Sequence, residues 1–344
     1  MTLFRVLVVV AISASGLWAC SPNRSTSGEV IVYASVDRAI AEPILERFEQ
    51  QASIKVRAVF DTEANKTTGL VNRLIAEVSR PQADVFWSGE IGQTVRLSRI
   101  GMFAPYRQNT ESDRSGRFMA SDDTWHAFSA RARVLLVNTE QVPVEEAPLS
   151  VEDLIDGRWK GRVAIADPHF GTTGTHLSAL LQAWGDERFR HWLMGLRENR
   201  VRLMPGNAQV RDAVVSGVVA AGLTDSDDAA EAVSRGAPVR VVYLRQSTDF
   251  GVIMIPNTVA LVRGGPNATA AAKLADYLLS RDTESRMVAI ESAFFPTRSG
   301  SGRADALARV ADSDPKEYET LADALPRMLE LVEAEWFQGG APSP

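Results

Sequence analysis

An acidic run follows one of the apolar strands that the sequence predicts. Asp225, Asp227 and Asp228 fall within four positions, directly after the predicted strand 220–224. Carboxylates this close repel one another unless a cation, hydrogen-bond donors or water offset their charge. Two interpretations stay open. Either Asp225 or Ser226 caps the next helix while Asp228 complements its dipole, or at least one carboxylate binds a ligand hydroxyl, an amine or a metal ion.

Threonines and glycines gather at the start of another predicted helix. Residues 171–175 have the sequence Gly-Thr-Thr-Gly-Thr. Backbone N–H groups before a helix bind anions well, and the hydroxyls of Thr172, Thr173 and Thr175 add donors. Capping of the helix by Thr173 or Thr175 is the alternative, and it does not preclude an anion. His176 follows directly and is either a ligand or a packed residue.

Motifs of common enzymes are absent from the sequence. It contains no Gly-x-Ser-x-Gly, no Walker loop, no dinucleotide-binding glycine pattern after the first strand and no His-Glu-x-x-His. The net charge is −6, and Lys and Arg are scattered, so nothing indicates nucleic-acid binding. The export signal, the tether and the hinge pattern described below favour a receptor over an enzyme. An exported hydrolase remains an alternative, because catalytic triads assemble in space rather than in sequence.

Strands and helices alternate along most of the chain, at the spacing of βαβ units. The first set comprises strands 30–33, 54–60 and 83–87 with helices 37–51, 67–78 and 91–100. The second set comprises strands 162–166, 202–204, 220–224 and 239–244 with helices 175–184, 187–198, 208–216 and 227–235. This pattern predicts an α/β protein with two doubly wound domains and mostly parallel sheets.

Two long apolar segments, 125–139 and 251–262, are expected to cross between these domains. The first lobe is then discontinuous and comprises residues 29–127 and 257–344, while residues 128–256 form the second lobe. Two lobes joined by two crossings predict a cleft that closes on a ligand by hinge motion. We expect a monomer.

Ligands of doubly wound domains lie at the carboxyl ends of strands, which selects the candidate cleft residues. In the first lobe they are Ser35, Asp37, Asp61, Glu63, Asn65, Lys66, Thr67, Trp87, Ser88 and Glu90. In the second lobe they are Thr172, Thr173, Thr175, His176, Asn207, Arg211, Asp225, Ser226 and Asp227. Arg211 either clamps a phosphate or carboxylate through two hydrogen bonds or is a solvated helix residue.

The N-terminus has the order of an export signal: Arg5, then apolar residues 6–12, then small residues up to Cys20. The ending Leu-Trp-Ala-Cys resembles the bacterial lipobox, which predicts a lipoprotein signal peptide at 1–20, lipid on Cys20 and a tether at 21–28. An ordinary signal peptide with an incidental cysteine is the alternative. Because Cys20 is the single cysteine, no disulfide and no thiolate metal site are expected.

Six segments together resemble one family, the extracellular solute-binding proteins of ABC importers, in the branch that binds ferric iron. These segments are residues 32–37, 60–71, 80–90, 156–164, 170–175 and 255–260. The resemblance covers essentially the whole chain after residue 29. It implies a periplasmic-binding-protein fold of type 2, a membrane permease and a cytoplasmic ATPase as partners, a periplasmic location and no catalysis.

The ligand stays open between two classes. Family members that bind ferric iron directly use adjacent tyrosines, where this chain has Asp225 and Ser226, and no two of its five tyrosines are neighbours. The histidine or acidic ligand that the family has early in the first domain falls near Asp37, and its later carboxylate falls at Gly89 beside Glu90. One hypothesis is iron, held through a chelate or synergistic anion at residues 171–175, or through carboxylates, of which the candidates are Glu63, Glu90, Asp225 and Asp227. The other is a small phosphorylated or amine-bearing organic anion.

Overall fold

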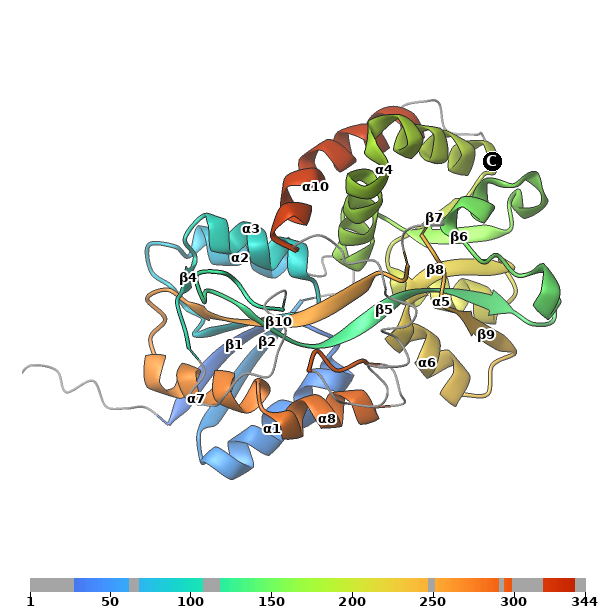
Figure 1. The fold of residues 1–344 in the computed structure, drawn as a ribbon. Helices are drawn as coiled ribbons and strands as arrows, with labels where there is room; N and C mark the ends of the chain where they lie inside the picture. Colours follow the sequence, from blue (N-terminus) through green and yellow to red (C-terminus); the bar gives the residue numbers. More distant parts are fainter. Residues whose placement is uncertain are drawn as a thin grey trace, which may run out of the picture.

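The computed structural model describes residues 28–61, 68–107, 118–246, 251–290, 294–298 and 318–337. Its strands form one continuous path in the order β2-β1-β3-β10-β5-β8-β6-β7, with β4 beside β10 and β9 beside β5. Figure 1 shows this path running through the molecule with helices on both sides. The long strands β5 (His126–Asn138) and β10 (Met254–Val262) lie at its centre.

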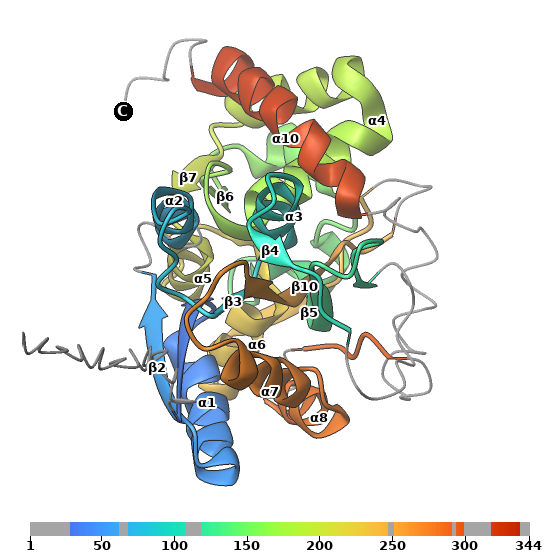
Figure 2. The ribbon, with the colours of Figure 1, turned by 90° about the vertical axis from the view of Figure 1, so that its left-hand side faces the viewer.

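The first half of the molecule is built on β1 (Glu29–Ser35), β2 (Lys55–Phe60), β3 (Val85–Ser88) and the short β4 (Phe103–Ala104). Its helices are α1 (Arg38–Ala52), α2 (Thr68–Ala76), α3 (Ile91–Arg99), α7 (Ala268–Leu278) and α8 (Arg281–Ala289). β1 pairs in parallel with β2 and β3. Figures 1 and 2 show α2 and α3 on one side of these strands and α1, α7 and α8 on the other.

The second half has β6 (Val163–Ala166), β7 (Arg202–Met204), β8 (Ala221–Asp225) and β9 (Val239–Val242) as its strands. Its helices are α4 (Gly171–Glu198), α5 (Asn207–Val215) and α6 (Ser226–Ser234), with short 3₁₀ turns η3 (Val144–Glu146), η4 (Val151–Ile155) and η5 (Gly157–Trp159). β6 is parallel to β7 and β8. α4 bends at Gly185, whose φ of 74° is not helical, so the two helices predicted for this segment are joined.

The crossing strands β5 and β10 are antiparallel to their neighbours, which corrects the prediction of mostly parallel sheets. β10 is antiparallel to β3 and β5, and β5 is antiparallel to β8 and β9. Parallel pairing is confined to strands linked by a helix, because only a long crossover brings the chain back in the same direction. All 13 residues of β5 are buried, which explains its long apolar run.

A β-bulge interrupts the pairing of the two crossing strands β5 and β10. The pairing of β5 with β10 shifts between Pro256 and Asn257, opposite Ser129. Ser129 has φ of 45°, a left-handed conformation that few residues other than glycine adopt. Its N–H donates to the buried Glu284 of α8 over 2.9 Å, and Asn257 Nδ2 donates to its hydroxyl over 3.0 Å. A bulge of this kind bends and twists a strand pair at a fixed point.

The last described helix, α10 (Tyr318–Val332), continues into a short π-helical turn, η6 (Glu333–Phe337). α10 packs on α4 and on α3, so it contacts both halves of the molecule. Arg99 of α3 pairs with Asp323 of α10, and Gln182 of α4 donates to Thr320 over 2.6 Å. The predicted lobe boundaries, which place residues 257–344 in the first lobe, stay a prediction.

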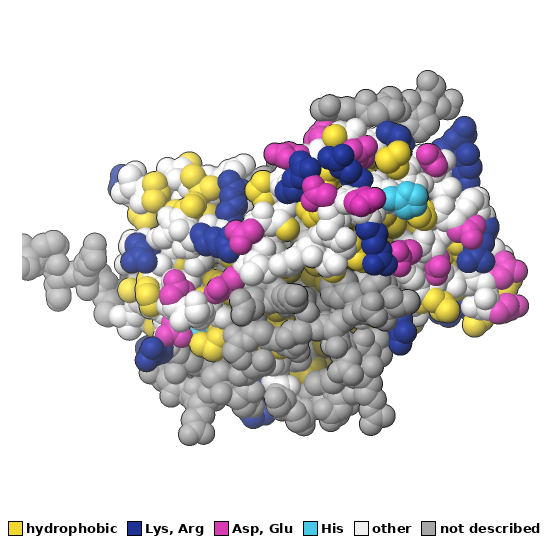
Figure 3. All heavy atoms as spheres, turned by 45° about the horizontal axis from the view of Figure 1, so that its top comes forward, with side chains coloured by type: hydrophobic (Ala, Val, Ile, Leu, Met, Phe, Trp, Pro, Cys, Tyr) yellow, Lys and Arg dark blue, Asp and Glu magenta, His cyan; other side chains and the backbone are white. Residues whose placement is uncertain are grey.

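None of the helices in the described ranges is long and apolar enough to cross a membrane. The predicted signal peptide 1–20 with Cys20, and all of the predicted tether except Gly28, lie outside the described residues. On the face in Figure 3, basic and acidic side chains are interspersed rather than gathered into a patch of one sign.

Candidate functional site

A small cavity lies where the two halves meet at the crossing strands. The first half contributes Ser35, Gly89 and Glu90, β5 contributes Arg131, and the second half contributes Ala166, Phe170, Gly171, Thr172, Pro205, Gly206, Asn207, Ala208, Asp225 and Asp228. Its volume is about 30 Å³, enough for about two water molecules or a small ion. A ligand larger than this volume requires the walls of the cavity to move apart.

Asp225, the last residue of β8, is a carboxylate at the cavity that accepts hydrogen bonds from three side chains. Arg133 Nη1 donates to it over 2.7 Å, the Thr172 hydroxyl over 2.6 Å and Asn207 Nδ2 over 3.0 Å. Burial raises the pKa of Asp225, but the guanidinium groups of Arg133 and Arg131 outweigh it and hold the pKa below its ordinary value. Asp225 is therefore an ionised carboxylate whose charge is offset within the protein.

Arg133 is fixed by a ring of partners, one of which is His176. Arg133 Nε donates to His176 Nδ1 over 3.2 Å, and the opposite ring nitrogen, Nε2, lies 2.6 Å from Gln246 Oε1. Burial, together with the charge of Arg133, lowers the pKa of His176 to about 3. The ring is neutral, so its Nδ1 accepts from Arg133 and its Nε2–H donates to Gln246. His176 thus orients Arg133 and does not line the cavity.

Arg131 is buried like Arg133, yet one edge of its guanidinium is unpaired. Its Nη1 lies 3.0 Å from Asp227 and 3.8 Å from Asp225, with 4% of the side chain exposed. Within the described part of the chain, no hydrogen-bond acceptor contacts Nε or Nη2. Burial lowers the pKa of Arg131, but Asp227, Asp225, Asp37 and Asp228 together raise it above its ordinary value. A charged guanidinium therefore lines the cavity with two donors available.

Glu90 connects the two halves directly. As the N-cap of α3 it accepts hydrogen bonds from Gly92 N (2.5 Å) and Gln93 N (2.8 Å), and it also accepts one from the Thr175 hydroxyl in the first turn of α4. Burial raises the pKa of Glu90, although these donors partly counter it. The hydrogen bond between Glu90 and Thr175 joins the first turns of α3 and α4 beside the cavity.

The segment 171–175 is the first turn of α4, not a loop before it as the sequence analysis expected. α4 begins at Gly171, where φ is 60°, and its N-cap is Phe170, which makes no side-chain capping bond. Neither Thr173 nor Thr175 therefore caps the helix. The first-turn N–H groups of a helix lack intrahelical partners and carry the positive end of its dipole. Gly171 and Thr172 bring that helix end to the cavity wall.

The other predicted site residues lie around the cavity in supporting roles. Ser35 donates to Ser88, whose hydroxyl donates to the Glu90 carbonyl. Ser226 accepts from Ala132 N over 3.0 Å. The Ser35–Ser88 bond joins the ends of β1 and β3, and the Ala132–Ser226 bond joins β5 to the start of α6. Thr173 is buried with its hydroxyl 3.5 Å from Arg133 Nη2.

Several predicted residues do not reach the cavity. Trp87 is a core residue, packed on the Phe128 ring at 5.6 Å between centroids. Arg211 pairs with Glu231 and with Asp212 (2.9 Å), so carboxylates of the protein already engage the guanidinium that was one candidate for an anion clamp. Asp61 accepts from Leu70 N at the start of α2, and Asp37 is the N-cap of α1. Glu63, Asn65, Lys66 and Thr67 lie outside the described residues.

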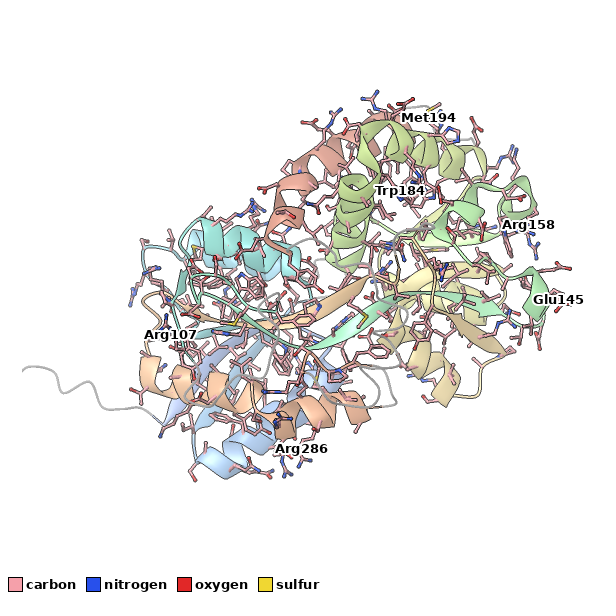
Figure 4. All side chains as sticks on the ribbon, in the orientation of Figure 1. Arg107, Glu145, Arg158, Trp184, Met194 and Arg286 are labelled. Atoms are coloured by element: carbon pink, nitrogen blue, oxygen red, sulfur yellow. The ribbon has the colours of Figure 1, made fainter. Side chains whose placement is uncertain are left out.

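Sequence reasoning missed Arg131 and Arg133. The available signal was their spacing, because residues two apart in a strand point to the same side. Two arginines at that spacing inside the apolar run of β5 have to be paired within the protein or with a ligand. In contrast, Arg107, Arg158 and Arg286, labelled in Figure 4, lie on the outside of the molecule, and each pairs with a nearby carboxylate.

The fold is that of the type 2 periplasmic binding proteins. Iron-bound HitA from Pseudomonas aeruginosa superimposes with a TM-score of 0.77 at 21% identity, covering 88% of this chain and 99% of HitA. AfuA from Actinobacillus pleuropneumoniae, solved with fructose-6-phosphate bound, gives a TM-score of 0.79 at 21% identity, covering 90% and 99%. These likenesses confirm the predicted α/β fold.

The family model of the bacterial extracellular solute-binding proteins matches residues 29–288, and the chain belongs to this family. Among its relatives, iron uptake protein A1 of Synechocystis is 25% identical over 97% of this chain and 96% of that protein. The major ferric iron-binding protein of Neisseria meningitidis is 24% identical over 83% and 85%. The predicted family is therefore confirmed, and the chain is a solute-binding receptor rather than an enzyme.

Proposed function

We propose that this protein is the periplasmic receptor of an ABC importer and that its solute is a small organic anion with a phosphate-like or carboxylate group. The unpaired Nε and Nη2 donors of Arg131, buried beside the first turn of α4, carry this proposal. Buried donors without partners cost free energy, which an incoming anion recovers. Together the two nitrogens form the edge with which arginine binds phosphate or carboxylate through parallel hydrogen bonds.

The first turn of α4 supplies the second half of the anion site. Phe170 provides no side-chain acceptor for the N–H groups of this turn, and Gly171 and Thr172 line the cavity. An anion held between these N–H groups and Arg131 would interact favourably with the helix dipole. Because the helix belongs to the second half and Ser35 and Gly89 to the first, such a ligand would favour the closed arrangement.

Polar groups elsewhere on the cavity wall suit the rest of an organic ligand. Asp228, which lines the cavity, accepts from the Thr224 hydroxyl over 3.2 Å and lies 3.7 Å from Arg211. Carboxylate oxygens accept hydrogen bonds from hydroxyl and ammonium groups. Ser35 and Asn207 add a hydroxyl and an amide. AfuA, solved with a sugar phosphate, shares the fold.

Ferric iron is the second candidate, favoured by the names of the relatives and by the acidic trio. One ligand oxygen each from Asp225, Asp227 and Asp228 lies within 4.8 Å of the others, and a single ion suits the cavity volume. Arg131 and Arg133 weigh against it, because they already offset Asp225 and Asp227 and repel a trivalent cation. None of the five tyrosines, all of them described, lines the cavity. Iron would thus enter as a chelate whose anionic part meets Arg131.

The remaining parts of the proposal concern the protein's surroundings. We propose that residues 1–20 direct export, that Cys20 carries lipid, and that residues 21–28 tether a monomeric receptor to the membrane. A permease and an ATPase would take the solute from the closed receptor. The family membership and the lipobox-like ending at Cys20 support these assignments.

Titration of the full chain in detergent tests the choice of ligand. Inorganic phosphate, glycerol 3-phosphate, fructose 6-phosphate and ferric citrate are compared by calorimetry. The proposal expects at least one phosphate compound to bind, and Arg131→Lys to weaken it about tenfold or more because lysine lacks the two-donor edge. Arg286→Lys, on the exposed face of α8, is the matched control. Binding of ferric citrate with no binding of any phosphate compound would transfer the assignment to iron.

A further inference from the structure

We propose that Gly89 determines the specificity of the cavity for anions, because its missing side chain leaves the space in which the ligand's anionic group meets Arg131. This inference rests on the proposed function. Gly89 lies between the end of β3 and the N-cap Glu90, and it lines the cavity together with Arg131. A Cβ atom at this position would lie 3.1 Å from Arg131 Nη2 and 3.3 Å from the Ser35 carbonyl oxygen.

Backbone conformation does not explain the glycine. Gly171 and Gly185 have φ values of 60° and 74°, which few other residues adopt, whereas the φ of Gly89 lies outside this left-handed region. A larger residue could follow the same backbone path here. The glycine at position 89 therefore leaves space free, and this space is bounded by Arg131 and by the backbone of Ser35.

Arg131 has little freedom to move aside for a side chain at position 89. Its Nη1 is held by Asp227 at 3.0 Å, and its guanidinium carbon lies 5.4 Å from the centre of the Phe294 ring. The whole side chain is buried. A side chain at 89 would thus press on the Nη2 end of the edge that carries the available donors.

The charge of a side chain at position 89 would determine whether Arg131 pairs within the protein or with a ligand. A carboxylate there would lie beside Nη2 and would accept from the edge that the ligand's anion needs, so the protein would satisfy Arg131 by itself. A neutral amide of the same size would fill the space and add less electrostatic pairing. Glycine leaves both the space and the positive charge to the ligand, and the site selects anions for that reason.

Three substitutions and one control separate size from charge. Gly89→Ala tests the methyl group, Gly89→Asn the size of the side chain and Gly89→Asp its charge. Gly157→Ala is the control, because Gly157 is exposed and no atom lies within 4 Å of its added Cβ. Each full-length variant is titrated with inorganic phosphate and fructose 6-phosphate, and its melting temperature is measured without ligand.

We expect Gly89→Asp to lower the affinity for both phosphates by about 10-fold to 100-fold, the range of a lost charge-assisted hydrogen bond. Its melting temperature without ligand should exceed that of Gly89→Asn, because the carboxylate pairs with Arg131 more strongly than the neutral amide does. Gly157→Ala should match the wild type. Unchanged phosphate affinity in Gly89→Asp, or a lower melting temperature than Gly89→Asn, overturns the role of Gly89. Failure of the wild type to bind any phosphate overturns instead the proposed function.

Discussion

Replacing Asp227 with asparagine separates the stability of this site from its affinity for a ligand. Asp227 is buried and lies 3.0 Å from Arg131 Nη1. Removing Asp227 leaves Asp225, 3.8 Å from Nη1, as the remaining ion-pair partner of Arg131, and breaking a buried ion pair costs about 3–5 kcal/mol of folding stability. For a chain of this length that loss lowers the melting temperature by about 5–8 °C. Thermal unfolding followed by circular dichroism measures it.

The same substitution should strengthen anion binding. Two unit charges about 6 Å apart at an effective dielectric constant of about 20 interact by about 3 kcal/mol, so the Asp227 carboxylate opposes any anion that binds Arg131. Its removal leaves a guanidinium with less negative charge nearby. We expect the affinity for fructose 6-phosphate to rise about tenfold or more by calorimetry, with inorganic phosphate following the same trend.

Opposite changes in stability and affinity are what the Arg131 site predicts. A carboxylate that binds iron would behave differently, because its loss would weaken the affinity for ferric citrate. Asp186→Asn serves as the control, since Asp186 forms an exposed ion pair with Arg327. A fall in phosphate affinity in Asp227→Asn, with the fold intact, would refute the reasoning.

Three further predictions concern buried polar contacts. In the folded protein the pKa of His176 is lowered to about 3, whereas the pKa of a histidine in an unfolded chain is about 6.5. The unfolded chain therefore binds a proton first, and the protein loses about 1.4 kcal/mol of folding stability per pH unit as the pH falls below about 6.5. His176→Gln should lack this dependence on pH when unfolding is measured from pH 7 to pH 4. A slope equal to that of the wild type would contradict the prediction. Glu284→Gln should cost about 3–5 kcal/mol in denaturant titrations, because Glu284 pairs with the buried Arg298 at 2.8 Å; a loss below 1 kcal/mol would argue against that pairing. Thr175→Val removes a donor to the buried Glu90 and should cost about 1–3 kcal/mol in the same titrations, whereas unchanged stability would show that this contact between the halves contributes nothing.

Much of the fold could be predicted from the sequence because its signals are local. The alternation of apolar strands and amphipathic helices depends on neighbours in the chain, and β1, α3 and β8 lie within a few residues of their predicted places. The crossing strands were visible as long apolar runs. Their antiparallel pairing was not predicted, because it depends on which distant strands they lie beside.

The candidate site was only partly predictable. Asp225 and Thr172 were found because they follow or precede regular elements at the edge where ligands bind. Arg131 and Arg133 were missed because an arginine in a strand is ordinarily a surface residue, and only the tertiary structure shows that both are buried. Arg211 was a plausible clamp by position alone, yet the carboxylates of Asp212 and Glu231 engage it.

The most direct test of the account is ¹⁵N NMR of the arginine side chains during titration of the full chain with fructose 6-phosphate. The Nε–H signal of Arg131 is assigned as the one lost in Arg131→Lys. Because this N–H lacks a partner in the described part of the protein, its signal should shift downfield as the phosphate binds, and fructose without phosphate should leave it in place. A signal that stays unchanged while the phosphate saturates the protein would contradict the assignment of Arg131 as the anion-binding residue.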